Sequence, residues 1–116
     1  MVSETNAIMG NLNLAEHELA GEKHVELWLS NNGYSGITRE NLQGKEIVII
    51  ATGNLETILI WVKTFVHPQR PYKLSEYDID KLIRMASKHK QVAYAAYVII
   101  DADKNLFGDI VWERLG

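Results

Sequence analysis

Two long runs of apolar, β-branched residues lie in the middle of the chain. They cover residues 46–52 (EIVIIAT) and 57–66 (TILIWVKTFV), with Gly53 and Asn54 between them. Such runs predict two strands, and the Gly-Asn step predicts a hairpin whose turn can take positive φ. Because the runs are apolar at almost every position, both faces of the sheet should be buried. We therefore expect helices on both sides.

Residues 13–32 carry the spacing of an amphipathic helix. Asn13, with Glu16 three residues later, has the spacing of a capping box, and Gly33 stands where a helix commonly ends. Gly21 inside the helix either weakens it or marks a close approach to a neighbouring element. The apolar stripe is expected to contain Leu14, Ala20, His24, Val25, Leu27, Trp28 and Leu29.

A second helix is predicted after the proline-containing loop 67–74. Ser75 and Asp78 form the S-x-x-D pattern of a helix N-terminus, and the cations of 88–90 suit the opposite end of the helix dipole. Its buried stripe should consist of Ile79, Leu82, Ile83 and Ala86.

Three further strands are expected at 34–39, 92–101 and 106–112. A turn at 103–105 should join the last two. Asp101 and the polar residues after it resemble the first ligands of a calcium loop. However, the positions that would need glycine and glutamate hold Leu106 and Trp112, which favours a simple turn. The predicted order of elements is α-β-β-β-α-β-β.

Composition limits the classes of protein that fit. The 116 residues suit one domain, which we place at 13–116, preceded by a flexible N-terminal arm at 1–12. Cysteine is absent, which excludes disulfides and thiolate zinc sites and favours a reducing cytoplasm. The apolar runs are too short to span a membrane. The net charge of −3 argues against a non-specific coat on nucleic acid but permits a local basic cleft.

Local motifs are more specific evidence for the fold than the order of elements is. The first helix resembles the pattern GE-x-x-A-x-x-x-L-x-x-x-GY at Gly21-Glu22, Val25, Trp28-Leu29 and Gly33-Tyr34. Further along, Arg39, Asn41 and residues 46–51 (EIVIIA) resemble an RN…EIDxIA stretch, and residues 60–64 (IWVKT) resemble VEVKT. Lys81 and Ala86 then match a K-x-x-x-x-A pattern.

In this order and spacing, the motifs resemble the PD-(D/E)xK restriction-endonuclease-like superfamily, near the Holliday-junction-resolvase-like and YraN-like small proteins. The resemblance covers about residues 20–100. It implies an α/β (α+β) fold with an αβββαβ core, a mixed central sheet flanked by helices, and here an extra C-terminal strand. It also implies Mg²⁺-dependent hydrolysis of phosphodiesters, in which carboxylates hold the metal and a lysine stabilises charge.

The chain departs from this pattern at its centre. Val48 stands where the family has the aspartate of EID, and Trp61 stands where it has the glutamate of ExK. Neither side chain can coordinate a hard cation. Lys63 and the helix-one Glu22 remain in register, so the motif is degenerate rather than absent.

Several residues keep two interpretations. Glu46 shares a strand face with Val48 and could join Glu22 and Lys63 in a displaced metal site, or it could be a solvated carboxylate at a strand start. Trp61 fits the core better than a base-stacking role. The side chain of Lys63 is either buried within the fold or extends so that its ammonium group reaches solvent. Candidate contacts to nucleic acid are Arg70, Lys73 and Lys81, each also compatible with an ordinary surface cation.

Three functional hypotheses follow. The first is a catalytically degenerate nuclease-fold protein that binds nucleic acid or acts as an interaction module and needs no cofactor. The second is an active Mg²⁺-dependent endonuclease that uses Glu22, Glu46 and Lys63. The third is a structural or oligomeric protein without nucleic acid. DNA and a second copy of the chain are the expected partners, with pairing through an edge strand as one route to a homodimer.

Overall fold

The computed structural model describes the backbone of residues 2–42 and 46–116 and the side chains of 15–41 and 46–116. Two helices and five strands follow one another as α1 (Val2–Asn31), β1 (Ser35–Leu42), β2 (Glu46–Thr52), β3 (Thr57–Val66), α2 (Glu76–Lys88), β4 (Val92–Ile100) and β5 (Val111–Arg114). The order of elements is the predicted one. Among the described residues, no helix is long and apolar enough to cross a membrane.

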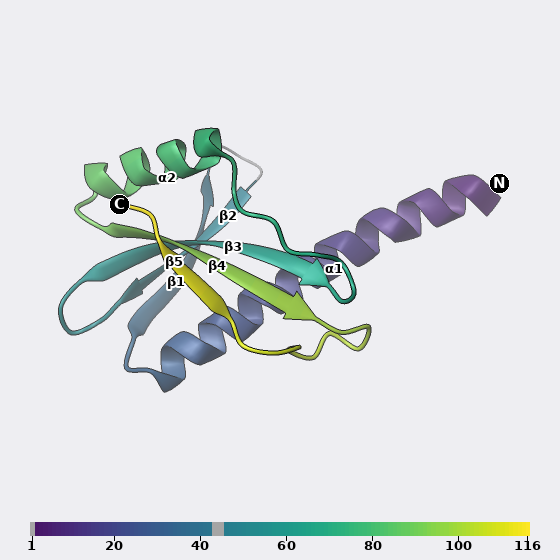
Figure 1. Cartoon of the computed structure of the whole chain (residues 1–116), viewed down its shortest axis with the longest axis horizontal. Helices are drawn as coiled ribbons and strands as arrows, with labels where there is room; N and C mark the ends of the chain where they lie inside the picture. Colours follow the sequence, from purple (N-terminus) through teal and green to yellow (C-terminus); the bar gives the residue numbers. More distant parts are fainter. Residues whose placement is uncertain (1, 43–45) are drawn as a thin grey trace.

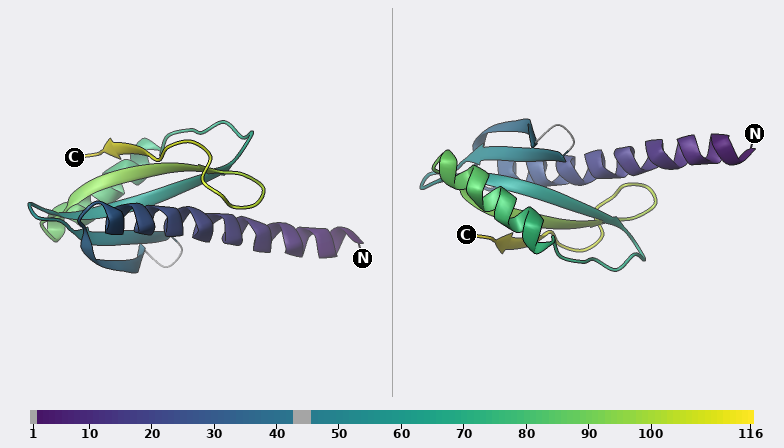
Figure 2. Two further views of the ribbon diagram at one scale, coloured as in Figure 1. Left: turned by 90° about the horizontal axis from the view of Figure 1, so that it is seen from below. Right: turned by 90° about the horizontal axis from the view of Figure 1, so that it is seen from above.

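The strands form one mixed sheet in the order β1-β2-β3-β4-β5, in which only β3 and β4 run parallel. The helix α2 makes the crossover that a parallel pair requires. Figures 1 and 2 show α1 and α2 on opposite faces of the sheet. The prediction of a mixed sheet covered on both faces is therefore confirmed.

Each face of the sheet has its own apolar core, because alternate strand residues point to opposite sides. On the α1 face, Val25 and Leu29 of the helix pack with strand residues such as Ile49 and Ile60. On the α2 face, buried Leu82 and Ala86 meet a second set of strand residues. The predicted stripe of α2 is confirmed, since Ile79 and Ile83 pack against the same cluster.

The helix ends follow local chemistry. The Ser75 side chain accepts a hydrogen bond from the Asp78 backbone N–H at 3.1 Å, which confirms the predicted N-cap of α2. After α1, Gly33 has a φ of +86° and the Tyr34 N–H donates to the Leu29 carbonyl at 3.0 Å. A glycine with positive φ commonly ends a helix in this way, so the helix end predicted at Gly33 is confirmed.

The expected start of α1 was wrong. The helix begins at Val2, so Asn13 lies inside it rather than at its cap. Nothing in the sequence before Asn13 stops a helix sterically, because no proline occurs there. Figure 1 shows the N-terminal half of α1 extending past the sheet. The side chain of Leu14, assigned to the apolar stripe, lies outside the described residues. Leu27 was assigned to the stripe incorrectly, since it is 60% exposed.

The strands at the two ends of the sheet also differ from expectation. β1 extends to Leu42, beyond the predicted end at Arg39, because its residues pair with β2 up to Leu42. The last strand begins at Val111 instead of Leu106, and Leu106 contributes only an isolated bridge to Ile100. The turn before it is confirmed: the Asp101 carboxylate accepts from the Asp103 and Asn105 backbone N–H groups.

The hairpin between β2 and β3 is confirmed, but its turn works differently from the prediction. Neither Gly53 nor Asn54 has positive φ. Gly53 is instead covered by the Tyr34 ring, and a Cβ at this position would lie 2.9 Å from the Tyr34 Cε1. The glycine is therefore required by close packing rather than by backbone conformation.

Candidate functional site

Val48 and Trp61 are direct partners across β2 and β3. Val48 is fully buried and Trp61 is 8% exposed, and both belong to the apolar cluster beneath α2. The placement of Trp61 in the core is thus confirmed. The two positions at which the resemblance puts carboxylates are adjacent in space, and they are filled by an isopropyl group and an indole.

These two side chains do not fit a divalent cation. Mg²⁺ needs oxygen ligands, and neither Val48 nor Trp61 carries an oxygen atom in its side chain. Among the residues whose side chains are described, no group of three or more His, Asp or Glu is arranged to hold a metal ion. The chemistry of the donor set therefore disagrees with the metal-dependent hydrolysis that the sequence motifs imply.

Lys63 lies on the same face of the sheet as Trp61, two residues further along β3. Its ammonium group sits 4.9 Å from the centre of the Tyr72 ring. Tyr72 in turn meets Phe65 edge-on, with ring centres 5.1 Å apart. The loop before α2 therefore lays an aromatic ring over the lysine, and the cation is stabilised by the ring face rather than by a carboxylate in the described region.

Glu22 points inward from α1, as its motif implied, and meets a cation from β1. The Arg39 guanidinium lies 3.2 Å from the Glu22 carboxylate and donates two hydrogen bonds to Glu26, at 2.8 and 2.6 Å. Burial raises the pKa of the Glu22 carboxyl above its ordinary value, and the charge of Arg39 offsets part of this effect. Sequence reasoning missed Arg39 as a structural partner, because short-range patterns do not reveal a pairing between a helix and a later strand.

Glu22 and Glu46 lie on opposite faces of the sheet. Arg39, the partner of Glu22, is opposite Ile49, which belongs to the core under α1. Glu46 precedes Val48 by two residues and so shares the α2 face. The fold brings Glu46 and Lys63 to one face and places Glu22 on the other.

Lys73, one of the predicted contacts to nucleic acid, is held in a small polar network. Its ammonium group contacts Glu113 at 3.1 Å, and the Tyr97 hydroxyl donates to the same carboxylate at 3.0 Å. These hydrogen bonds lower the pKa of Glu113 below its ordinary value. Arg70 is exposed in the same loop. These two cations and Lys63 come from one connected stretch of chain, the end of β3 and the loop that follows.

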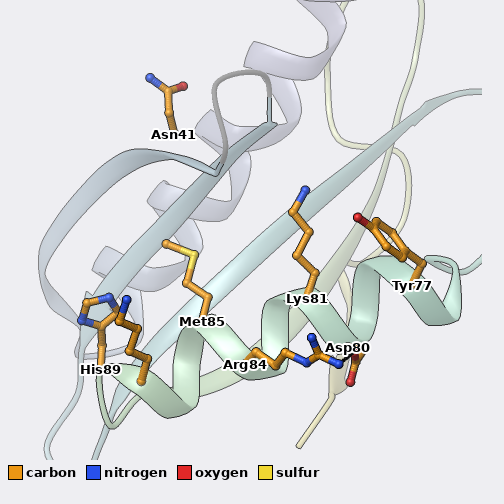
Figure 3. A pocket seen from close by; sticks show the side chains of 8 residues that line it. Asn41, Tyr77, Asp80, Lys81, Arg84, Met85 and His89 are labelled. Atoms are coloured by element: carbon orange, nitrogen blue, oxygen red, sulfur yellow. Dashed lines mark ion pairs between the residues drawn. The ribbon is translucent and has the colours of Figure 1, made fainter.

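A groove of about 480 Å³ runs along α2 (Figure 3). Lys81 and Met85 extend from the helix toward the sheet, and Asn41 of β1 lies on the far side. Lys81, the third predicted contact, is therefore part of this groove. The other side chains that line the groove are Tyr77, Asp80, Arg84, Lys88 and His89.

Charge is strongly segregated along the chain. Residues 63–90 contain seven Lys or Arg and three Asp or Glu, a net charge of +4 in a chain whose total is −3. This segment comprises the end of β3, the loop 67–75, α2 and residues 89–90, with the loop and helix on one face of the sheet (Figure 2). In contrast, the described part of α1 carries four glutamates at 16–26. The excess of basic residues in this segment is visible in the sequence. Only the fold shows that the loop and the helix of the segment come together on one side of the sheet.

Comparison with known proteins agrees with this architecture. No family model and no curated protein matches the sequence. Among solved structures, the chain resembles Hjc, a Holliday junction resolvase from the archaeal hyperthermophile Archaeoglobus fulgidus. The TM-score is 0.60 at 14% sequence identity, over 84% of this chain and 72% of the resolvase. At this identity the likeness concerns the fold: the chain has the restriction-endonuclease-like fold of a Holliday junction resolvase, with apolar residues at the two central motif positions.

Proposed function

We propose that this chain is a catalytically degenerate nuclease-fold protein that binds nucleic acid through its α2 face and does not cleave it. The observation that carries the proposal is the buried pair of Val48 and Trp61. A nuclease of this fold needs a metal to polarise the phosphoryl group and activate water. With an isopropyl group and an indole in place of two carboxylates, the Mg²⁺ that an active enzyme would use has no ligands at the centre of the motif.

The charge of the α2 face supports retained binding. Affinity for nucleic acid comes largely from cations that neutralise phosphates, and it depends on where the charges lie rather than on their sum. The segment 63–90 has a net charge of +4, and its loop and helix lie on the α2 face of the sheet (Figure 2). Arg70, Lys73 and Lys81 all belong to this segment and remain the candidate contacts to phosphate.

The rival hypothesis of an active enzyme requires Glu22, Glu46 and Lys63 around one metal ion. The sheet separates Glu22 from the other two, and Glu22 already pairs with Arg39 at 3.2 Å. This arrangement favours a structural role for Glu22 in joining α1 to β1. A homodimer paired through an edge strand, β1 or β5, remains a prediction, as does residence in a reducing cytoplasm.

The proposal is tested by incubating the folded protein with branched, single-stranded and duplex DNA in Mg²⁺ or Mn²⁺. An active metal-dependent endonuclease serves as the positive control. We expect no cleavage, together with binding in EDTA that weakens steeply as salt rises. Metal-dependent cleavage that is abolished in both Lys63→Ala and Glu22→Ala, with circular dichroism showing that both variants fold, would overturn the proposal. Absence of binding, together with a stable oligomer, would support the structural hypothesis instead.

A further inference from the structure

We infer that the groove along α2 binds single-stranded nucleic acid, with phosphates at Lys81 and Lys88 and a base stacked on Tyr77. The inference rests on the proposed function, because it names the kind of nucleic acid and the surface that receives it. The groove lies between α2 and Asn41 of β1, and its lining does not include the motif positions Val48 and Trp61, which α2 covers.

The lining residues of α2 form a continuous stripe. Tyr77, Lys81, Arg84 and Lys88 follow one another at intervals of four, three and four residues, so they share one face of the helix. At a rise of about 1.5 Å per residue, the stripe is about 16 Å long, the length of a few nucleotides. It presents an aromatic ring at one end and cations at successive helical turns.

The cations of the stripe are available to an anionic polymer. Asp80 is the one carboxylate among the residues that line the groove, and it contacts Arg84 at 2.8 Å. Both side chains of this pair are largely exposed, at 80% for Arg84 and 60% for Asp80, and such a pair contributes little in water. A phosphate can therefore displace Asp80 from Arg84 at small cost, while Lys81 and Lys88 have no ion pair with any described side chain.

The exposed ring of Tyr77 indicates which kind of anionic ligand fits the groove. Tyr77 is 75% exposed and belongs to neither apolar core. An exposed ring beside cations is the arrangement that stacks an unpaired base while the backbone follows the charges. The bases of a duplex are already stacked on each other and offer no free face at its side. An acidic polypeptide would use the cations but would leave the ring without a partner.

The test measures fluorescence anisotropy in EDTA with labelled oligothymidine of about 20 nucleotides and a duplex of the same length. We expect the single strand to bind more tightly. Tyr77→Ala should weaken its binding at least about fivefold, whereas Tyr77→Phe, which keeps the ring, should bind like the original protein. Lys81→Ala combined with Lys88→Ala should lower the dependence of log affinity on log salt by about 0.7 for each phosphate that is left without its lysine.

Lys23→Ala is the matched control, since this exposed lysine lies on α1, across the sheet from the groove. It should leave affinity for the single strand unchanged, and all variants should melt at the same temperature as the original protein. Equal or tighter binding to the duplex, or affinity unaffected by the Tyr77 and lysine substitutions, would overturn the inference and leave the proposed function standing. Competition by polyglutamate that is insensitive to Tyr77→Ala would identify an acidic-polypeptide site instead. Absence of binding to any nucleic acid would remove both proposals.

Discussion

The backbone of α1 at Gly21 lies directly against the side chain of Thr64 on β3, so that a Cβ on Gly21 would overlap the Thr64 Oγ1. Gly21 belongs to the helix-one motif, and this contact explains why the motif position holds glycine. Because Glu22 is the next residue, the same close approach sets the depth at which its carboxylate meets Arg39.

Gly21→Ala should therefore destabilise the protein. In an exposed helix the same change is stabilising by up to about 1 kcal/mol. Here we expect a loss of about 1–3 kcal/mol, because the added methyl group forces β3 and α1 apart. The free energy of unfolding in urea is the measurement. Combining Gly21→Ala with Thr64→Ala should cost less than the sum of the two single changes. A Gly21→Ala protein as stable as the original would contradict the close approach.

Restoring a carboxylate at Val48 should be costly. Val48→Asp places a charge among the buried apolar side chains beneath α2, and we expect a loss of at least about 3 kcal/mol. Val48→Ala, which removes two methyl groups and leaves a small cavity, should cost about 2 kcal/mol and serves as the control. Urea unfolding in EDTA measures both. A Val48→Asp protein as stable as Val48→Ala would indicate that water or a cation reaches this position.

Glu22 and Glu113 should make the stability of the protein depend on pH in opposite directions. The pKa of Glu22 is raised in the folded chain, chiefly by burial, so the folded chain binds this proton more tightly than the unfolded chain does. The stability that this shift contributes should be fully present below the ordinary pKa of 4.5. It should be lost as pH rises through the higher pKa of Glu22 in the folded chain. The pKa of Glu113 is lowered, first by the hydrogen bond from Lys73 and then by that from Tyr97. Its contribution should be present above 4.5 and be lost as pH falls.

The measurement compares urea unfolding of the original protein with Glu22→Gln and Glu113→Gln between about pH 4 and pH 7.5. Relative to the Glu22→Gln variant, the original protein should lose stability as pH rises. Relative to the Glu113→Gln variant, it should gain stability over the same interval. Parallel trends for the two variants would show that burial does not dominate at Glu22.

The contact between Lys63 and Tyr72 should be measurable as a coupling energy. Lys63→Met keeps the apolar stem of the side chain and removes the charge, and Tyr72→Leu removes the ring. A double-mutant cycle of the two should give about 0.5–1 kcal/mol, the size of a partly exposed cation–π contact. Tyr72→Phe keeps the ring face and should leave stability nearly unchanged. A coupling of zero would mean that the ammonium group turns to solvent.

The parts of the fold that depend on local chemistry were predictable from the sequence. The bounds of β2 and β3 match their apolar runs, and Ser75 caps α2 as the S-x-x-D pattern indicates. The end of α1 at Gly33 follows from glycine's access to positive φ. In each case the deciding interaction lies within a few residues of the sequence signal.

Features set by distant contacts were not predictable in this way. The last strand begins at Val111 because β5 pairs with Tyr94–Tyr97, a register that no local pattern specifies. Arg39 meets Glu22 and Glu26 across two elements. At the candidate site, the substitutions at Val48 and Trp61 were visible in the sequence. The groove along α2 was not, because it forms only when the fold brings Asn41 of β1 beside the helix.

The parallel pairing of β3 with β4 also governs the order in which the chain can assemble. β2 and β3 are joined by a four-residue turn and can pair early, whereas β3 and β4 are separated by residues 67–91 and must close a long loop first. Until that closure, β3 carries TILIWVKTFV along an unpaired edge, without charge before Lys63. An unpaired apolar edge is a template for other chains. The central strand β3 is thus exposed to aggregation until β4 pairs with it.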